Sequence, residues 1–219
     1  MECLCSKCNQ NLMNNHVLED CTIPPMTNKS KIIRPRCSSC DSEINLTDIS
    51  ANIKANSKVL LISGTAGAGK TAIGQLIEQN KNYIFVDGDA IQKKVNYFAK
   101  NVPGYKGDYY MDTLNVLLIL LALGYDVVIG YIFYGDKLQM FYDELNKYEV
   151  SPIFRVLVPK RRVCLQRDID RECWTAGAKW VDEWYDEMRA FLVKQPIVCI
   201  DNSNETLEET YYNHFEKLL

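Results

Sequence analysis

Apolar residues from Lys58 onward gather in short runs that alternate with stretches of helical periodicity. Five of these runs are rich in β-branched and aromatic residues, which favours buried strands. They are Val59–Ser63, Tyr83–Val86, Asp126–Tyr131, Ile153–Val158 and Ile197–Ile200. Because strands that alternate with helices join as right-handed β-α-β units, we expect a five-stranded parallel sheet with helices on both faces. The pattern therefore predicts a three-layer α/β domain over residues 58–219.

The most apolar stretch of the chain, Val116–Leu123, is too short to span a membrane. It stops after eight residues at Gly124, whereas a membrane-spanning helix needs about 20 apolar residues. A buried helix leading into the third strand is therefore expected. The N-terminus has no basic segment followed by an apolar core, so no signal peptide is indicated and a cytoplasmic location is the expectation.

The overall charge gives no sign of a strongly acidic partner. A net charge of −3 and an isoelectric point near 5.5 provide no electrostatic reason to bind nucleic acid or an anionic membrane. The basic run Lys29–Arg36 is a local exception, read either as a solvated arm or as a contact for a phosphate backbone. Nucleic acid is therefore possible as a partner but not favoured, and the sequence does not indicate an oligomeric state.

Residues 1–46 differ from the rest, because six of the nine cysteines lie among the first forty residues. Two Cys-x-x-Cys pairs stand out, Cys5 with Cys8 and Cys37 with Cys40. Each pair can present two thiolates to one tetrahedral ion, and the two pairs together predict a structural Zn²⁺ site. The segment resembles a zinc ribbon. It holds few large apolar residues, so the metal would supply much of its stability.

Other interpretations of this segment remain open. The two pairs could instead be redox-active or disulfide-linked, although neither lies in the strand-helix unit that a thioredoxin-like site needs. Cys3, His16 and Cys21 are alternative ligands that we rank lower. The polar residues 47–57 are expected to form a linker or a short helix before the α/β domain.

The first predicted strand runs into a glycine-rich loop that fits the phosphate-loop pattern, Gly64-x-x-Gly67-x-Gly69-Lys70-Thr71. Glycines let backbone N–H groups point at a phosphate, and the helix that follows adds the positive end of its dipole. Lys70 would reach the β- and γ-phosphates of a nucleotide, and the Thr71 hydroxyl would ligate Mg²⁺. The alternative is a glycine-rich turn with a chance lysine. The expected nucleotide-binding residues are Gly64, Thr65, Ala66, Gly67, Ala68, Gly69, Lys70, Thr71 and Ala72.

The second predicted strand is followed by Asp87-Gly88-Asp89. Carboxyl ends of parallel strands meet at one edge of a sheet, so both carboxylates should lie at the same edge as the phosphate loop. One of them could accept the proton of an attacking hydroxyl, and the other could orient Mg²⁺ through water. The alternative is a turn in which Asp89 only caps the helix from Ala90 onward.

The phosphate loop followed by Asp87-Gly88-Asp89 resembles the P-loop small-molecule kinases, a family that includes adenylyl-sulfate kinase, gluconate kinase and the chloramphenicol phosphotransferases. The resemblance covers residues 58–219. It implies an ATP- and Mg²⁺-dependent transfer of the γ-phosphoryl group to a hydroxyl of a small molecule, such as a nucleoside, a sugar or an antibiotic. It also implies that Asp89 is the general base, with Asp87 as a candidate for Mg²⁺.

Two features depart from the family pattern. Adenylyl-sulfate kinases have an arginine soon after the acidic motif, whereas this chain reads Ala90-Ile-Gln-Lys-Lys94. Adenylyl sulfate is therefore not the expected substrate. The third strand also ends at Tyr131 without the aspartate of a typical Walker B motif, so Mg²⁺ would depend on Thr71, the two aspartates and water.

The segment after the fourth strand resembles the lid of P-loop kinases, over about residues 160–181. Residues four apart in a helix share a face, so Arg167 and Arg171 are expected to project together over bound triphosphate. In the family, lid arginines neutralise the charge that moves during transfer. The alternative is a surface helix in which Asp168 and Asp170 pair with these arginines.

The acceptor is not identified by the sequence. By analogy its pocket would come from residues 92–123, where tyrosines serve either as ligand contacts or as packing residues. Tyr131 and Tyr134 are further candidates, and Asn202 with Ser203 could lie beside the nucleotide base. Two other functions stay open: a kinase or processing factor for nucleic-acid ends that docks through the zinc segment, and a non-catalytic ATP-binding switch whose zinc segment binds a partner.

Overall fold

The computed structural model describes residues 52–101, 107–171, 175–194 and 196–219. The predicted zinc site of Cys5, Cys8, Cys37 and Cys40 lies outside the described residues, as do its alternative ligands. Within the described ranges, no group of His, Cys, Asp and Glu side chains could hold a metal ion. No helix in this part of the chain is long and apolar enough to cross a membrane.

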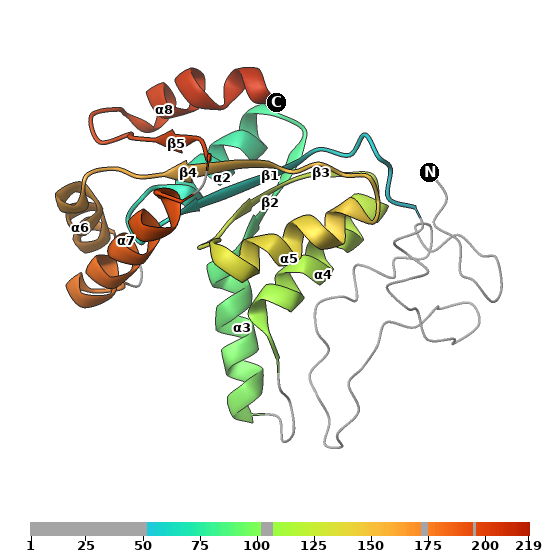
Figure 1. The fold of residues 1–219 in the computed structure, drawn as a ribbon, viewed down its shortest axis with the longest axis horizontal. Coiled ribbons are helices and arrows are strands. Elements are labelled where there is room, and N and C mark those ends of the chain that lie inside the picture. Colours follow the sequence, from blue (N-terminus) through green and yellow to red (C-terminus); the bar gives the residue numbers. More distant parts are fainter. Residues whose placement is uncertain (1–51, 102–106, 172–174, 195) are drawn as a thin grey trace. The chain divides into compact units, whose positions relative to one another are not determined.

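The predicted parallel sheet is confirmed. Its strands are β1 (Val59–Gly64), β2 (Tyr83–Asp87), β3 (Asp126–Gly130), β4 (Ile153–Leu157) and β5 (Cys199–Ile200). All neighbours pair in parallel in the order β2-β3-β1-β4-β5, so the strand that enters the phosphate loop lies at the centre (Figure 1). The last strand is shorter than predicted, because only Cys199 and Ile200 pair with β4.

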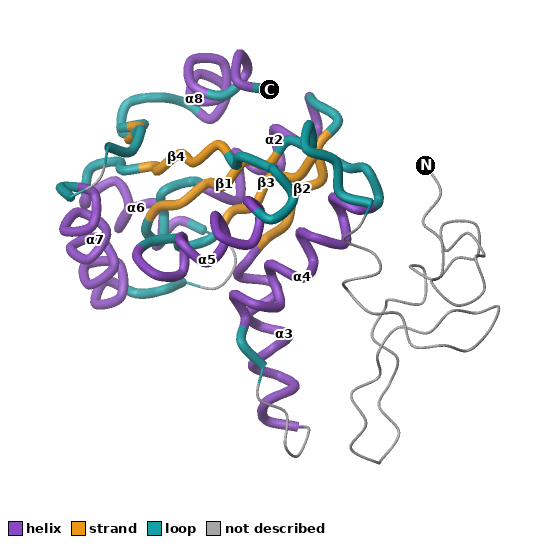
Figure 2. The backbone as a smooth tube through the Cα atoms, turned by 45° about the vertical axis from the view of Figure 1, so that its right-hand side comes forward, coloured by secondary structure: helices purple, strands orange, loops and turns teal. Residues whose placement is uncertain are grey.

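The described residues fall into two compact units. One contains residues 58–89 and 126–219, and the other contains residues 90–125 and the described residues before 58. The first of these units holds all five strands, and Figure 2 shows how loops and helices join them. Its helices are α2 (Lys70–Asn80), α5 (Gly135–Asn146), α6 (Arg161–Asp170), α7 (Ala178–Leu192), α8 (Leu207–His214) and the 3-10 helix η1 (Glu216–Leu218).

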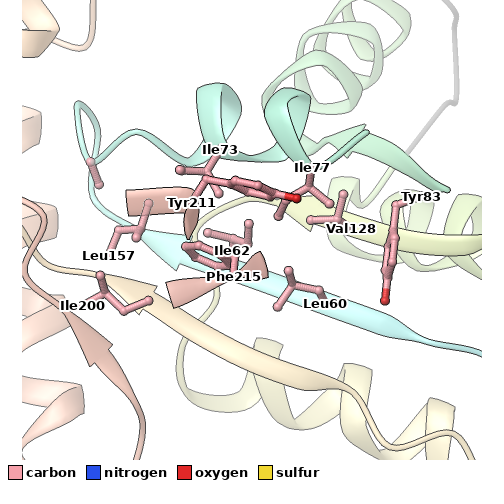
Figure 3. Close-up of a cluster of buried hydrophobic side chains, with 11 residues drawn as sticks. Leu60, Ile62, Ile73, Ile77, Tyr83, Val128, Leu157, Ile200, Tyr211 and Phe215 are labelled. Atoms are coloured by element: carbon pink, nitrogen blue, oxygen red, sulfur yellow. The ribbon is translucent and has the colours of Figure 1, made fainter. Parts of the chain in front are cut away.

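The core of the sheet-containing unit lies between the sheet and α2 with α8 (Figure 3). Ile73 and Ile77 of α2 pack with Phe215, which follows α8, against the strands. The buried strand side chains in this cluster come from all five strands: Leu60, Ile62, Tyr83, Val128, Leu157 and Ile200. Alternate residues of a strand point to opposite faces, and helix α5 covers the other face (Figure 1). The three-layer prediction therefore holds for this unit.

The other unit contains α4 (Tyr109–Ala122) and most of α3 (Gly88–Asn101). Helix α4 begins where the Asp108 carboxylate accepts hydrogen bonds from the N–H groups of Tyr110 and Met111. This helix contains the most apolar run of the chain, and Leu117, Leu118 and Leu121 are buried. The expectation of a buried helix before the third strand is confirmed.

Candidate functional site

The phosphate loop connects β1 to α2, and its glycines adopt backbone angles that other residues avoid. The φ angles of Gly64, Gly67 and Gly69 are +146°, +73° and +100°. A Cβ atom on Gly67 would lie 2.1 Å from the carbonyl oxygen of Cys164, and one on Gly64 would lie 2.6 Å from that of Leu157. The glycines therefore do more than expose N–H groups, because they also let the loop pack against the backbone of β4 and α6.

Lys70, the first residue of α2, is folded back onto the loop. Its side chain is 7% exposed, and its Nζ donates to the carbonyl oxygens of Gly64 and Thr65 at 2.9 and 3.0 Å. Burial lowers the pKa of Lys70; the negative charges of Asp89 and Asp87 oppose this, and the positive charge of Arg171 adds to it. Residues from three separate elements thus act on this ammonium group.

The two aspartates lie where β2 ends, beside β3. Asp87 pairs with Gly130, and its Oδ1 accepts the N–H of Asp89 at 2.9 Å. Since α3 begins at Gly88, it is Asp87 that bonds to the first turn, and the alternative in which Asp89 caps the helix is wrong. Asp89 is half-buried in that first turn, and its negative charge opposes the lowering of the Lys70 pKa by burial.

The segment after β3 is packed rather than open. Tyr131 and Phe133 are buried, and the Ser63 hydroxyl at the end of β1 both donates to the carbonyl of Phe133 and accepts its N–H, each at 2.9 Å. The Tyr134 hydroxyl donates to Glu187 of α7 at 2.7 Å. Tyr134 thus ties the segment after β3 to α7.

Arg167 and Arg171 do not lie on one helix face. Helix α6 ends at Asp170, and Arg171 has an extended backbone, so the prediction of a shared face is wrong. Arg167 donates to the backbone oxygen of Asn202 at 3.0 Å, whereas Arg171 forms an ion pair with Asp168. The two guanidinium groups are held by different partners because the chain leaves the helix between them.

Helix α7 covers the phosphate loop together with α6. The Thr65 hydroxyl donates to the carbonyl of Val181 at 3.4 Å, and Ala66 packs in a cluster with Cys164, Val181 and Tyr185. Helices α6 and α7 are joined by Arg161, which pairs with Asp182 and Asp186 of α7. The segment expected as a lid is therefore in contact with the loop, and α7 continues beyond it to Leu192.

Asn202, expected beside a nucleotide base, is bonded to the phosphate loop. Its side chain is 4% exposed, and its Nδ2 donates to the carbonyl oxygen of Ala68 at 3.3 Å. The neighbouring Ser203 hydroxyl accepts the N–H of Lys160 at 2.6 Å. These bonds join the segment after β5 to the loop and to the start of α6. The sequence offers only an asparagine two residues after the last strand as a signal for this role; its burial is seen in the structure alone.

Thr71 and Ala72 continue the phosphate loop into α2. Both residues are half-buried, and they lie in the first turn of the helix beside Lys70. The phosphate loop, Asp87 and Asp89 thus follow the carboxyl ends of β1 and β2, whereas Arg167 is bonded to Asn202 and Arg171 is paired with Asp168.

Solved structures share this fold. The tunicamycin resistance protein of Deinococcus radiodurans is similar with a TM-score of 0.53 and 16% identity, over 72% of this chain and 93% of that chain. The APS kinase of Mycobacterium tuberculosis, solved with AMPPNP and APS, has a TM-score of 0.53 and 15% identity, over 74% and 97%. Shikimate kinase from Bacteroides thetaiotaomicron has a TM-score of 0.51 and 17% identity, over 74% and 98%.

These likenesses show that the chain has a P-loop kinase-like α/β fold, as the sequence predicted. No model of a protein family matches the sequence, and no curated protein matches it.

Proposed function

We propose that this protein is an ATP-dependent, Mg²⁺-requiring kinase that transfers the γ-phosphoryl group to a hydroxyl of a small molecule. The observation that carries the proposal is the buried Lys70 of a phosphate loop, set among the charges of Asp89, Asp87 and Arg171. Two neighbours in fold are kinases by name, which supports the same reaction type.

The phosphate loop suits the triphosphate of ATP. Its glycines bring backbone N–H groups to the start of α2, where the helix dipole favours an anion. Lys70 would exchange the carbonyl oxygens of Gly64 and Thr65 for phosphate oxygens, which form stronger, charge-assisted hydrogen bonds. The same exchange brings the lysine charge to the β- and γ-phosphates.

Mg²⁺ fits the oxygen ligands that the site offers. The Thr71 hydroxyl lies in the first turn of α2 and the Asp87 carboxylate lies at the end of β2, and hydroxyl, carboxylate and phosphate oxygens are what this ion prefers. Bound there, the ion would neutralise charge on the phosphates. One oxygen of Asp87 accepts a hydrogen bond from the N–H of Asp89, and this bond orients the carboxylate.

Asp89 is the proposed general base. As its carboxylate takes the proton of the acceptor hydroxyl, the hydroxyl oxygen bonds to the γ-phosphorus, and the bond from that phosphorus to the bridging oxygen breaks. The products are the phosphorylated acceptor and ADP. Arg167 and Arg171 would stabilise the negative charge on the transferred group.

We further propose that Cys5, Cys8, Cys37 and Cys40 bind one Zn²⁺ in residues 1–46. This proposal rests on the spacing of the two Cys-x-x-Cys pairs, since these residues lie outside the described part of the chain. A cytoplasmic location, where thiols stay reduced, agrees with zinc rather than disulfides at these positions.

A mass-spectrometric screen tests the kinase. The full-length protein is incubated with ATP and Mg²⁺ and with pools of nucleosides, sugars, aminoglycoside- and phenicol-type antibiotics and 5′-hydroxyl oligonucleotides. We expect one small molecule to gain the mass of a phosphate, with Lys70→Ala inactive. Lys217→Ala, which removes an exposed lysine of η1, is the matched control and should keep activity.

Other outcomes separate the remaining functions. If only the oligonucleotides gain a phosphate, the protein is a nucleic-acid end kinase and not a small-molecule kinase. ATP binding without transfer to any acceptor would instead support the nucleotide-switch function.

A further inference from the structure

Asp168 of α6 is a carboxylate buried at the edge of the phosphate-loop site. Its side chain is 2% exposed, and carboxylates are seldom buried to this degree unless they are paired, because desolvation is costly. The alternative to the lid prediction placed Asp168 on a surface helix, paired with these arginines; the pair with Arg171 is found, but Asp168 is buried. Its burial shows that it has a specific set of partners.

Three donors compensate the buried charge. Oδ2 accepts the N–H of Gly177 at 2.9 Å, and Oδ1 accepts the N–H of Ala176 at 3.1 Å. Oδ1 is also the partner of the Arg171 guanidinium in an ion pair. One carboxylate thus bonds both to Arg171 and to the backbone N–H groups just before α7.

The start of α7 leads back to the phosphate loop. Gly177 precedes α7, and its carbonyl accepts the N–H of Val181 at 3.1 Å. The carbonyl of Val181 in turn accepts the Thr65 hydroxyl of the loop. On the other side of Asp168, the charge of Arg171 acts on the ammonium group of Lys70. Asp168 therefore links Arg171 through the start of α7 to the phosphate loop.

We propose that Asp168 is a positioning residue that holds Arg171 toward the γ-phosphate end of a bound nucleoside triphosphate. This inference rests on the proposed function, since it concerns the same site. A guanidinium fixed by a buried carboxylate loses less conformational freedom when it meets a phosphate than a free side chain does. ATP should gain more from this preorganisation than ADP, because only ATP carries the γ-phosphate.

Calorimetric titration of the full-length chain tests the inference, with AMP-PNP and ADP as ligands in the presence of Mg²⁺. D168N removes the charge and leaves one oxygen to accept hydrogen bonds. We expect AMP-PNP to bind about tenfold more weakly, the loss of one charge-assisted contact, and ADP to be affected much less. D170N is the matched control, because Asp170 lies two residues on in the same helix, is exposed and accepts a hydrogen bond from Gln166. This variant should bind both ligands as the wild type does.

A double-mutant cycle separates positioning from a purely structural role. If Asp168 acts through Arg171, D168N should cause no further loss of AMP-PNP affinity in an R171M background. An equal loss in both backgrounds would overturn the inference. If D168N does not fold, D168E takes its place, because it keeps the charge but displaces the carboxylate by one methylene. D168E should also weaken AMP-PNP binding, and it should cause no further loss of affinity in the R171M background.

The two proposals can fail separately. If the wild-type chain binds neither nucleotide, the kinase proposal fails and this inference fails with it. If Lys70-dependent binding is found and D168N binds AMP-PNP as tightly as the wild type does, the kinase proposal stands and only the inference is overturned.

Discussion

Gly88 lies directly against the ring of Tyr131. A Cβ atom on Gly88 would come within 2.4 Å of two ring atoms of Tyr131 and 2.6 Å of its Cβ. Tyr131 follows β3 and is buried, while Gly88 separates Asp87 from Asp89 at the end of β2. The contact between a residue without a side chain and an aromatic ring thus sets the spacing of the two strand ends at which the candidate carboxylates lie.

Gly88→Ala should destabilise the protein, because the added methyl group overlaps the Tyr131 ring. Overpacking of this kind costs about 1–3 kcal/mol, which urea denaturation would detect as a lower midpoint at unchanged slope. In a Tyr131→Ala background the space is open, and the same substitution should cost much less. Equal costs in both backgrounds would mean that the ring does not oppose the methyl group.

Nucleotide affinity should fall at alkaline pH because of Lys70. Burial lowers the pKa of this lysine below the 10.5 of an exposed one, and only its charged form attracts phosphate. Affinity for AMP-PNP should therefore decrease as pH rises through the Lys70 pKa, before pH 10.5 is reached. Lys70→Arg, whose guanidinium stays protonated, should remove this decrease even if it binds more weakly.

The lowered pKa of Lys70 should make the ligand-free protein more stable as pH rises, although nucleotide affinity falls. Between the lowered pKa of Lys70 and 10.5, the unfolded chain binds more protons than the folded one, so the free energy of unfolding should rise with pH in this window. Lys70→Met should flatten the rise. A fall in this window that depends on Lys70 would contradict the assigned burial.

Asp89→Asn should separate binding from transfer. Loss of a general base costs about 10²–10⁴-fold in rate, while the triphosphate site in the loop remains. We expect AMP-PNP to bind with little change and transfer to the acceptor found in the screen to collapse. Asp136→Asn, an exposed aspartate in the first turn of α5, is the control. Weak binding with an undiminished transfer rate would remove Asp89 as the base.

Phe215 is expected to be essential for the stability of the sheet-containing unit. Its side chain is fully buried against α2 and the strands, and removal of such a ring costs about 3–5 kcal/mol. Phe215→Ala should lower the free energy of unfolding by that amount. Tyr212→Ala, which removes a 55% exposed ring of α8, should change it by no more than about 0.5 kcal/mol.

Metal analysis tests the zinc proposal. The purified protein should contain one Zn²⁺ per chain, and the double substitution Cys5→Ser with Cys8→Ser should release it. Cys164→Ser is the control, because this buried cysteine has its pKa raised to about 11 by burial and is therefore a poor metal ligand. Full zinc content in the double variant would rule out this ligand set.

Much of the fold could be predicted because its signals are local. The strand at Val59, the glycines of the loop and Lys70 follow one another within a dozen residues, and each constrains its neighbours. A helix containing Arg167 was expected in the same way from the residues after the fourth strand. Its end was not, because the helix stops before Arg171, and that residue forms an ion pair with the buried Asp168. The pairing of Asp168 with Arg171, three residues apart, was among the alternatives that the sequence offered. The burial of Asp168 against the N–H groups of Ala176 and Gly177 was not, because helical periodicity contains no information on it.

The parallel sheet and a phosphate loop at the same sheet edge as Asp87 and Asp89 are predictable from the sequence, because strand periodicity and motif spacing depend on neighbouring residues. The bond of Asn202 to Ala68, 134 residues away, and the contact of α7 with Thr65 are seen only in the folded chain. Such contacts depend on the strand order β2-β3-β1-β4-β5, which places β4 and β5 beside β1. The partners of each candidate side chain follow from that order and from close packing, not from their separation along the chain.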